Sequence, residues 1–160
     1  MRIEADRIYL RRFELSDREG LFSLHREEAI MKFTRKGRAI SADESFENLK
    51  TIISENERDY PLGKWACFLK EDDSFLGWFG FWPSEFDNEP ELGFMIAIPQ
   101  WGKGYTTEAA KAILDYYDAH KVHALTTLDN FPSQRVLEKL GFELLKEDEE
   151  SKHFVKVKSD

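Results

Sequence analysis

The segment from residue 91 to residue 120 places the strongest constraint on the fold. An apolar run typical of a strand, 91–98, leads into Pro99-Gln-Trp-Gly-Lys-Gly104 and then into a helical pattern from about Thr106 to His120. The apolar stripe of that helix consists of Ala109, Ala110, Ile113, Leu114 and Tyr117. A strand that passes through glycines directly into a helix is typical of proteins in which helices cover a sheet.

The rest of the chain supplies elements that fit this architecture. Apolar residues at helical spacing predict helices over about 16–28, 41–60 and 132–140. Aromatic and β-branched runs predict strands at 7–13, 65–70, 75–82, 122–128, 142–146 and 153–158. The resulting order, β-α-α-β-β-β-α-β-α-β-β, predicts an α/β or α+β protein with one mixed central sheet and helices on both faces. No linker or repeat interrupts this order, so we expect a single domain over residues 1–160.

Two Ser-x-x-Glu patterns mark the starts of the first two helices. Ser16-Asp-Arg-Glu19 and Ser41-Ala-Asp-Glu44 both match the capping box, in which the serine and the glutamate satisfy free backbone amides of the first turn. We therefore expect Ser16 and Ser41 to be N-cap residues. The basic segment 31–40 between the two helices contains Gly37 and is expected to be a loop.

Composition and charge exclude several classes of protein. The chain has 23 Lys and Arg against 31 Asp and Glu, a net charge of −8, which disfavours non-specific binding to nucleic acid. Apolar runs are too short to span a bilayer, and the first residues, 1–6, lack the apolar core of a signal peptide, so we expect a cytoplasmic protein without a membrane partner. Cys67 is the single cysteine, and the four histidines show no metal-binding spacing, so no metal is expected.

The glycines at 102 and 104 indicate an anion-binding turn. Between a strand and a helix, such a turn lets consecutive backbone amides point into one concavity, with the positive end of the helix dipole behind them. Glycine is required because a side chain would block the approach of phosphate oxygens. A diphosphate is the natural ligand of such a site, although many Gly-x-Gly turns are only connections.

Two other phosphate motifs do not fit this turn. A nucleotide P-loop needs four residues between its first glycine and a Gly-Lys-Ser/Thr, which Gly102-Lys-Gly-Tyr-Thr106 does not supply. The dinucleotide fingerprint needs a third glycine where this chain has Thr107, and it belongs to the first βαβ unit of its domain. Both nucleotide-binding classes are therefore disfavoured.

Three linked motifs resemble the GNAT superfamily of acetyltransferases, and most of all its RimJ/RimL branch of ribosomal-protein N-terminal acetyltransferases. They are Pro99-Gln-Trp-Gly-Lys-Gly-Tyr-Thr-Thr-Glu-Ala109, Asn130-Phe-Pro-Ser133 and Leu137-Glu-Lys-Leu-Gly-Phe142. The resemblance covers about residues 91–142 in motifs and nearly the whole chain in element order. It implies a mostly antiparallel sheet of about seven strands whose fourth and fifth strands, 91–98 and 122–128, splay apart.

The resemblance also implies a site for acetyl-CoA, the co-substrate. Backbone amides in the loop made by Trp101, Gly102, Lys103, Gly104, Tyr105 and Thr106 would hold the pyrophosphate, with Tyr105 packed beside the cofactor. Asn130 would contact the pantetheine arm. An amide near Phe94 or Ile96 would polarise the acetyl carbonyl.

The catalytic groups are less well defined than the cofactor site. Many relatives carry a tyrosine that protonates the leaving thiolate at the position of Leu137, which leucine cannot do, so Ser133 or a water would replace it. Ser133 also fits a helix-start role. Glu91, with Glu89 as a weaker alternative, is the candidate general base at the start of the splayed strand, although a solvated charge there is equally compatible with the sequence.

The resemblance implies an amine acceptor, either a protein N-terminus or a small molecule. Among the aromatics Trp65, Phe68, Trp78, Phe79, Phe81 and Trp82, one or two are expected to line the acceptor pocket beside the basic loop 32–38, and the others to be core. A non-catalytic acyl-CoA-binding regulatory domain is the alternative that the missing tyrosine allows. The oligomeric state stays open, a homodimer included.

Overall fold

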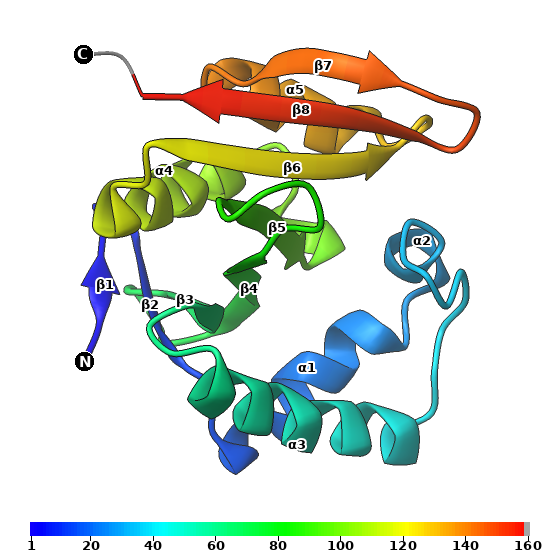
Figure 1. The fold of residues 1–160 in the computed structure, drawn as a ribbon. Helices are drawn as coiled ribbons and strands as arrows, with labels where there is room; N and C mark the ends of the chain where they lie inside the picture. Colours follow the sequence, from blue (N-terminus) through cyan, green and yellow to red (C-terminus); the bar gives the residue numbers. More distant parts are fainter. Residues whose placement is uncertain (159–160) are drawn as a thin grey trace.

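One eight-stranded sheet organises residues 1–158, the part of the chain that the computed structural model describes (Figure 1). Its strand order is β1-β2-β3-β4-β5-β6-β8-β7. The strands are β1 (Ile3–Glu4), β2 (Ile8–Arg12), β3 (Gly63–Leu69), β4 (Phe75–Pro83), β5 (Pro90–Ile96), β6 (Lys121–Thr127), β7 (Glu143–Glu147) and β8 (Ser151–Val157). Neighbouring strands are antiparallel except β5 and β6. The predicted mixed sheet is confirmed, with the short β1 added beyond the expected seven strands.

Helices pack on both faces of the sheet, as predicted. They are α1 (Arg18–His25), α2 (Glu28–Met31), α3 (Ala42–Arg58), α4 (Tyr105–Tyr117) and α5 (Phe131–Lys139). One apolar cluster joins α4 and α5 to the sheet through Ala110, Ile113 and Leu137. A second cluster joins α1 and α3 to the opposite face through Leu24 and Leu49. The central strands of the sheet are therefore buried between two helical layers, while β7 at its edge is exposed.

The two predicted helix caps have different outcomes. Ser41 is the N-cap of α3, and its side chain accepts a hydrogen bond from the amide of Glu44. Ser16 is not a cap, because it lies inside a short 3₁₀ turn whose capping box is formed by Glu14 and Asp17. Arg11 fixes this arrangement, since its guanidinium binds both carboxylate oxygens of Asp17 at 2.8 and 2.9 Å.

The segment after α1 also differs from the prediction. The first helix ends at His25 rather than near Glu28, and a separate short helix, α2, spans the junction between the predicted helix and the expected loop. Ile30 and Met31 are buried there. Burial of these two apolar side chains stabilises a helical turn that the local sequence marks only weakly. In Figure 1, α2 lies at the right of the molecule, and it packs against α1.

Strands β5 and β6 diverge from a single point of contact. They pair only through Glu91 and His123, close to the start of each strand. Beyond that pair, β6 continues with β8 and β7 as one arm of the sheet, while β5 continues with β4 (Figure 1). The predicted splay is thus present, and the wedge between the diverging strands holds the candidate site.

Candidate active site

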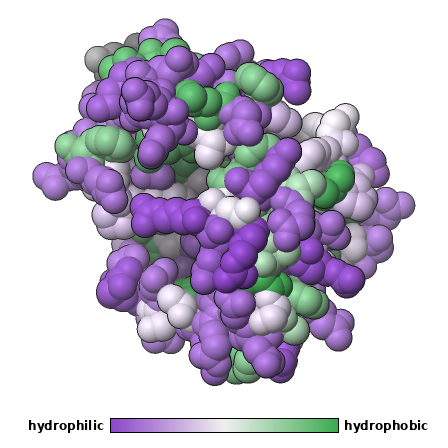
Figure 2. Space-filling view, turned by 90° about the vertical axis from the view of Figure 1, so that its right-hand side faces the viewer, coloured by the Kyte–Doolittle hydropathy of each residue, from purple (hydrophilic) through white to green (hydrophobic). Residues whose placement is uncertain are grey.

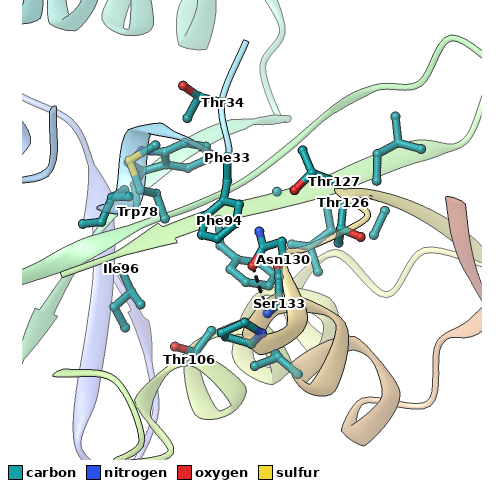
Figure 3. Close-up of a pocket in the computed structure, with 18 of the residues that line it drawn as sticks. Phe33, Thr34, Trp78, Phe94, Ile96, Thr106, Thr126, Thr127, Asn130 and Ser133 are labelled. Atoms are coloured by element: carbon teal, nitrogen blue, oxygen red, sulfur yellow. Dashed lines mark hydrogen bonds between the residues drawn. The ribbon is translucent and has the colours of Figure 1, made fainter. Parts of the chain in front are cut away.

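A cavity of about 990 Å³ runs through the wedge and reaches both helical layers. One end is lined by the glycine turn and α5, through Trp101, Gly102, Gly104, Thr106, Asn130 and Ser133. The other end is lined by α1, α2, α3 and the β3–β4 hairpin, through His25, Met31, Phe33, Asn48, Lys64, Trp78 and Trp82. Figure 3 shows Phe33 and Trp78 on one side of β5, and Asn130, Ser133 and Thr106 on the other. The cavity therefore offers two compartments joined at the wedge.

The outer surface is hollowed on the side where α2 lies. Figure 2 shows this face, and hydrophilic side chains surround most of the hollow. Arg35, Lys36 and Glu85 belong to the cavity lining there. Arg35 and Glu85 are 3.9 Å apart and almost fully exposed, so their attraction is weak.

The wall of the wedge presents free backbone amides. The amide of Ala97 donates to the carbonyl of Leu76 on β4 at 2.7 Å. Since successive amides of a strand point to opposite sides, those of Phe94 and Ile96 point away from β4 and into the wedge. Both residues line the cavity. Two hydrogen-bond donors therefore face the gap where β5 has lost its neighbour.

The glycine turn closes one end of this wedge. Gly102 and Gly104 have φ angles of +79° and +83°, in the left-handed region that favours glycine. Gly104 is the N-cap of α4, so the amides of Tyr105, Thr106 and Thr107 are in the first turn and have no partner within the helix. The indole of Trp101 donates to the carbonyl of Ile96 at 3.0 Å, which ties the turn to the end of β5.

Arg7, the residue directly before β2, holds the glycine turn in place. Its guanidinium donates to the carbonyl of Lys103 at 3.0 Å and to Glu108 at 2.7 Å, and it lies 4.5 Å from the ring centroid of Tyr105. The backbone amide of Arg7 also donates to Glu108 at 2.7 Å. No local pattern indicates this role, because the contacts of Arg7 span 96 and 101 residues of sequence.

The opposite wall is formed by β6 and the start of α5. Asn130 is the N-cap of α5, and its side-chain oxygen accepts from the amide of Ser133 at 3.3 Å. This bond leaves the amide nitrogen of the Asn130 side chain for a ligand. Thr126, which the sequence did not indicate, has a buried hydroxyl without a partner among residues 1–158. Thr126 also lines the cavity.

The two candidate bases lie in different environments. Glu91 lines the cavity and is half-buried, and burial raises the pKa of its carboxyl, with a hydrogen bond from Trp82 opposing the shift. Glu89 is also partly buried, but it does not line the cavity. A carboxylate with a raised pKa at the cavity wall is suited to proton transfer near neutral pH.

The predicted site residues fall into two groups. Glu91, Phe94, Ile96, Trp101, Gly102, Gly104, Thr106, Asn130 and Ser133 line the cavity. Lys103 and Tyr105 do not: the Lys103 ammonium lies 3.4 Å from Gln100, and Tyr105 lies under Arg7. Leu137 is buried and also lines the cavity, so this part of the wall is apolar.

The aromatic residues divide as the sequence suggested. Trp78 and Trp82 line the cavity, whereas Trp65, Phe68, Phe79 and Phe81 are buried in the core. Phe33 and three neighbours from the basic loop, Thr34, Arg35 and Lys36, line it as well. Cys67 is buried in the core.

A polar cluster built around two buried histidines lies beside Glu91 and was not predicted. His123 bonds to His153 at 2.8 Å and to Asp87 at 3.0 Å, and Lys121 adds an ion pair to Asp87 at 3.1 Å. The cluster fixes the β4–β5 connection against β6. Within residues 1–158, no group of three His, Cys, Asp or Glu side chains is arranged to hold a metal ion, and no helix is long and apolar enough to cross a membrane.

Comparison with known proteins points to acetyltransferases. A family model described as an acetyltransferase (GNAT) domain matches residues 7–143. The Bacillus subtilis protein YkkB is 33% identical over 147 residues, which cover 88% of this chain and 84% of that protein. YnaD of Bacillus subtilis, described as an uncharacterized N-acetyltransferase, is 28% identical over 145 residues, with 88% and 82% covered.

Solved structures share the fold at lower sequence identity. A GNAT-family acetyltransferase from Bacillus anthracis superposes with a TM-score of 0.86 at 19% identity, with 98% of both chains covered. RimL, a ribosomal L7/L12 α-N-protein acetyltransferase solved with coenzyme A, gives a TM-score of 0.83 at 15% identity, again with 98% of both chains covered. The chain therefore belongs to the GNAT acetyltransferase family and is an acetyl-transferring enzyme.

Proposed function

We propose that this protein is a RimJ/RimL-like N-acetyltransferase that moves the acetyl group of acetyl-CoA to a primary amine, by direct attack of the amine on the thioester. The observation that carries the proposal is the wedge itself. Two unpaired strand amides lie between a glycine turn at a helix N-terminus and a compartment lined by a half-buried carboxylate.

The donor compartment fits coenzyme A by the chemistry of its lining. Amides from Gly102 to Thr106 would bind the pyrophosphate, and the α4 dipole adds favourable potential. Lys103 and Tyr105 would contribute through the backbone, since their side chains face elsewhere. The side-chain amide of Asn130 would donate to the pantetheine arm.

The residues at the wedge would each carry out a different part of the chemical step. Acetyl-CoA supplies an activated acetyl group as a thioester. The amides of Phe94 and Ile96 are placed to donate to the carbonyl oxygen as negative charge develops on it during attack. Glu91 would take the proton that the attacking nitrogen loses when the N–C bond forms. Ser133 or a water would protonate the sulfur as the C–S bond breaks, because Leu137 cannot.

The need for Glu91 depends on the acceptor. An α-amine with a pKa near 8 is about one-tenth neutral at pH 7, which costs roughly 1.4 kcal/mol. An alkyl amine with a pKa near 10.4 costs roughly 4.6 kcal/mol by the same arithmetic. A base is therefore optional for a peptide N-terminus and important for an alkyl amine. RimL acts on the N-terminus of a ribosomal protein, and we propose a protein N-terminus or a small amine as acceptor, met in the cytoplasm.

The test is release of thiol from acetyl-CoA with a panel of peptides, amino acids and polyamines. We expect thiol release that depends on the amine, together with a product whose mass has increased by one acetyl group. Tight binding of coenzyme A without turnover on any amine would instead favour a non-catalytic acyl-CoA-binding domain.

A further inference from the structure

The end of the cavity lined by α1, α2, α3 and the β3–β4 hairpin, here called the acceptor compartment, contains a cation that forms no ion pair at contact distance. Lys64 lines the cavity from β3, and no carboxylate within residues 1–158 lies within salt-bridge distance of its ammonium. The nitrogen lies 4.5 Å from the ring centroid of Trp78 and 5.7 Å from that of Trp82. Aromatic faces stabilise a cation but leave its hydrogen-bonding capacity unused.

Two glycines on neighbouring strands leave room on the sheet for the Lys64 side chain. Lys64 pairs with Gly80, which pairs with Gly93, so two glycines lie side by side in the row next to the lysine. A Cβ on Gly80 would lie 2.9 Å from Cγ of Lys64, and one on Gly93 would lie 2.0 Å from Cη2 of Trp82. Both side chains therefore lie flat on the sheet, and the ammonium is held between the two indoles.

Neutral polar groups from the helices complete this end of the cavity. His25 on α1 bonds through Nδ1 to Ser45 at 2.8 Å and lines the cavity, as does Asn48 one turn further along α3. Burial, and then the charge of Lys64, lower the pKa of His25 to about 4, so the ring is neutral at pH 7. Burial also lowers the pKa of Lys64, and the charge of Glu55, which is not in salt-bridge contact, only partly opposes this shift.

We infer that the acceptor is an amine that also carries a carboxylate, bound with the carboxylate against Lys64 and the amine directed toward Glu91 and the wedge. The inference rests on the proposed acetyl transfer. A carboxylate would give Lys64 its missing ion pair, and His25 and Asn48 offer further hydrogen bonds. Only β4 separates β3 from β5, so their backbones are about 10 Å apart. A spacer of a few carbon atoms between the amine and the carboxylate of the acceptor fits the distance between β3 and β5.

The experiment compares matched acceptors on the wild-type enzyme. 4-Aminobutyrate, 5-aminovalerate and a Ser-Glu dipeptide amide are tested against the corresponding carboxamides and a Ser-Gln dipeptide amide. We expect KM to be at least about tenfold lower for one carboxylate than for its carboxamide, the effect of a charge-assisted hydrogen bond. The pair of dipeptide amides, Ser-Glu and Ser-Gln, shows whether the enzyme recognises a carboxylate on a peptide side chain as well as that of a free amino acid.

Variants identify the group responsible. Lys64→Met should abolish the preference and Lys64→Arg should keep most of it, while Lys50→Met, which removes a charge on the exposed face of α3, should leave it unchanged. Calorimetry of carboxylate binding to the coenzyme A complex gives a readout independent of turnover. Carboxylate binding without acetylation of any amine would refute the proposed function and keep the subsite. Equal KM for acid and amide, or a preference that survives Lys64→Met in a folded protein, would overturn the inference.

Discussion

Replacing Gly104 by alanine tests whether the glycine turn binds coenzyme A. The residue has φ +83°, a conformation that costs an L-residue about 1–2 kcal/mol. A Cβ there would also lie 3.3 Å from Nη2 of Arg7, so the guanidinium must move by a few tenths of an ångström. The free protein can relieve this strain by relaxing the turn. Binding of coenzyme A must then restore the strained conformation of the turn.

This reasoning gives a magnitude for the loss of affinity. If binding restores the full strain, 1–2 kcal/mol corresponds to a rise in Kd of about 5- to 30-fold. We expect the upper part of this range, because the displaced Arg7 also holds the carbonyl of Lys103. Isothermal titration calorimetry with coenzyme A measures Kd, and thermal unfolding measures the effect on stability.

Gly37→Ala is the matched control. Gly37 has φ +68° with nothing within 4 Å of the added Cβ, so the backbone strain is similar but the site is remote from the turn. It should lower the melting temperature and leave the Kd of coenzyme A unchanged. The reasoning is refuted if Gly104→Ala binds coenzyme A within twofold of the wild type while the protein keeps its fold.

Three further substitutions address the roles of single side chains. Arg7→Met should raise the KM for acetyl-CoA about two- to fivefold with a small loss of stability, since its ion pair with Glu108 is partly exposed; an unchanged KM would exclude a positioning role. Glu91→Gln should lower kcat more for an alkyl amine than for a peptide N-terminus, and it should remove the fall in activity that occurs as pH drops through the raised pKa of Glu91; equal effects on both acceptors would contradict its role as base. His25→Gln should reduce the pH dependence of unfolding between about 6.5 and 4, measured by denaturant titration. The folded pKa of His25 is lowered to about 4, so its stabilising contribution is present above 6.5 and is lost as pH falls toward 4; a pH dependence like that of the wild type would contradict this assignment.

Local patterns predicted the order of the elements well, and long-range contacts explain where they failed. Ser41 and Ser16 have the same Ser-x-x-Glu pattern, yet only Ser41 is a cap. The difference is Arg11, which holds Asp17 across a turn and moves the capping box back to Glu14. Strand β1 has two residues and depends on pairing with β2, so no pattern of its own could reveal it.

The candidate site shows the same limit. The glycine turn and Asn130 were predictable because they belong to contiguous motifs. Arg7 and Lys64 were not, since each gains its role from the partners that folding places beside it. His123 and His153 lie 30 residues apart and become neighbours only because β8 inserts between β6 and β7.

The single pair that joins β5 to β6 has a mechanical consequence. The strands beyond Glu91 and His123 leave two facing backbone edges whose hydrogen-bonding groups have no strand between them. A ligand that entered this gap would act as a short substitute strand and would brace the two arms of the sheet against each other. Amide hydrogen exchange at residues 94–96 and 125–127 should therefore slow on both edges at once when coenzyme A is added, which couples occupancy of the gap to the rigidity of the whole sheet.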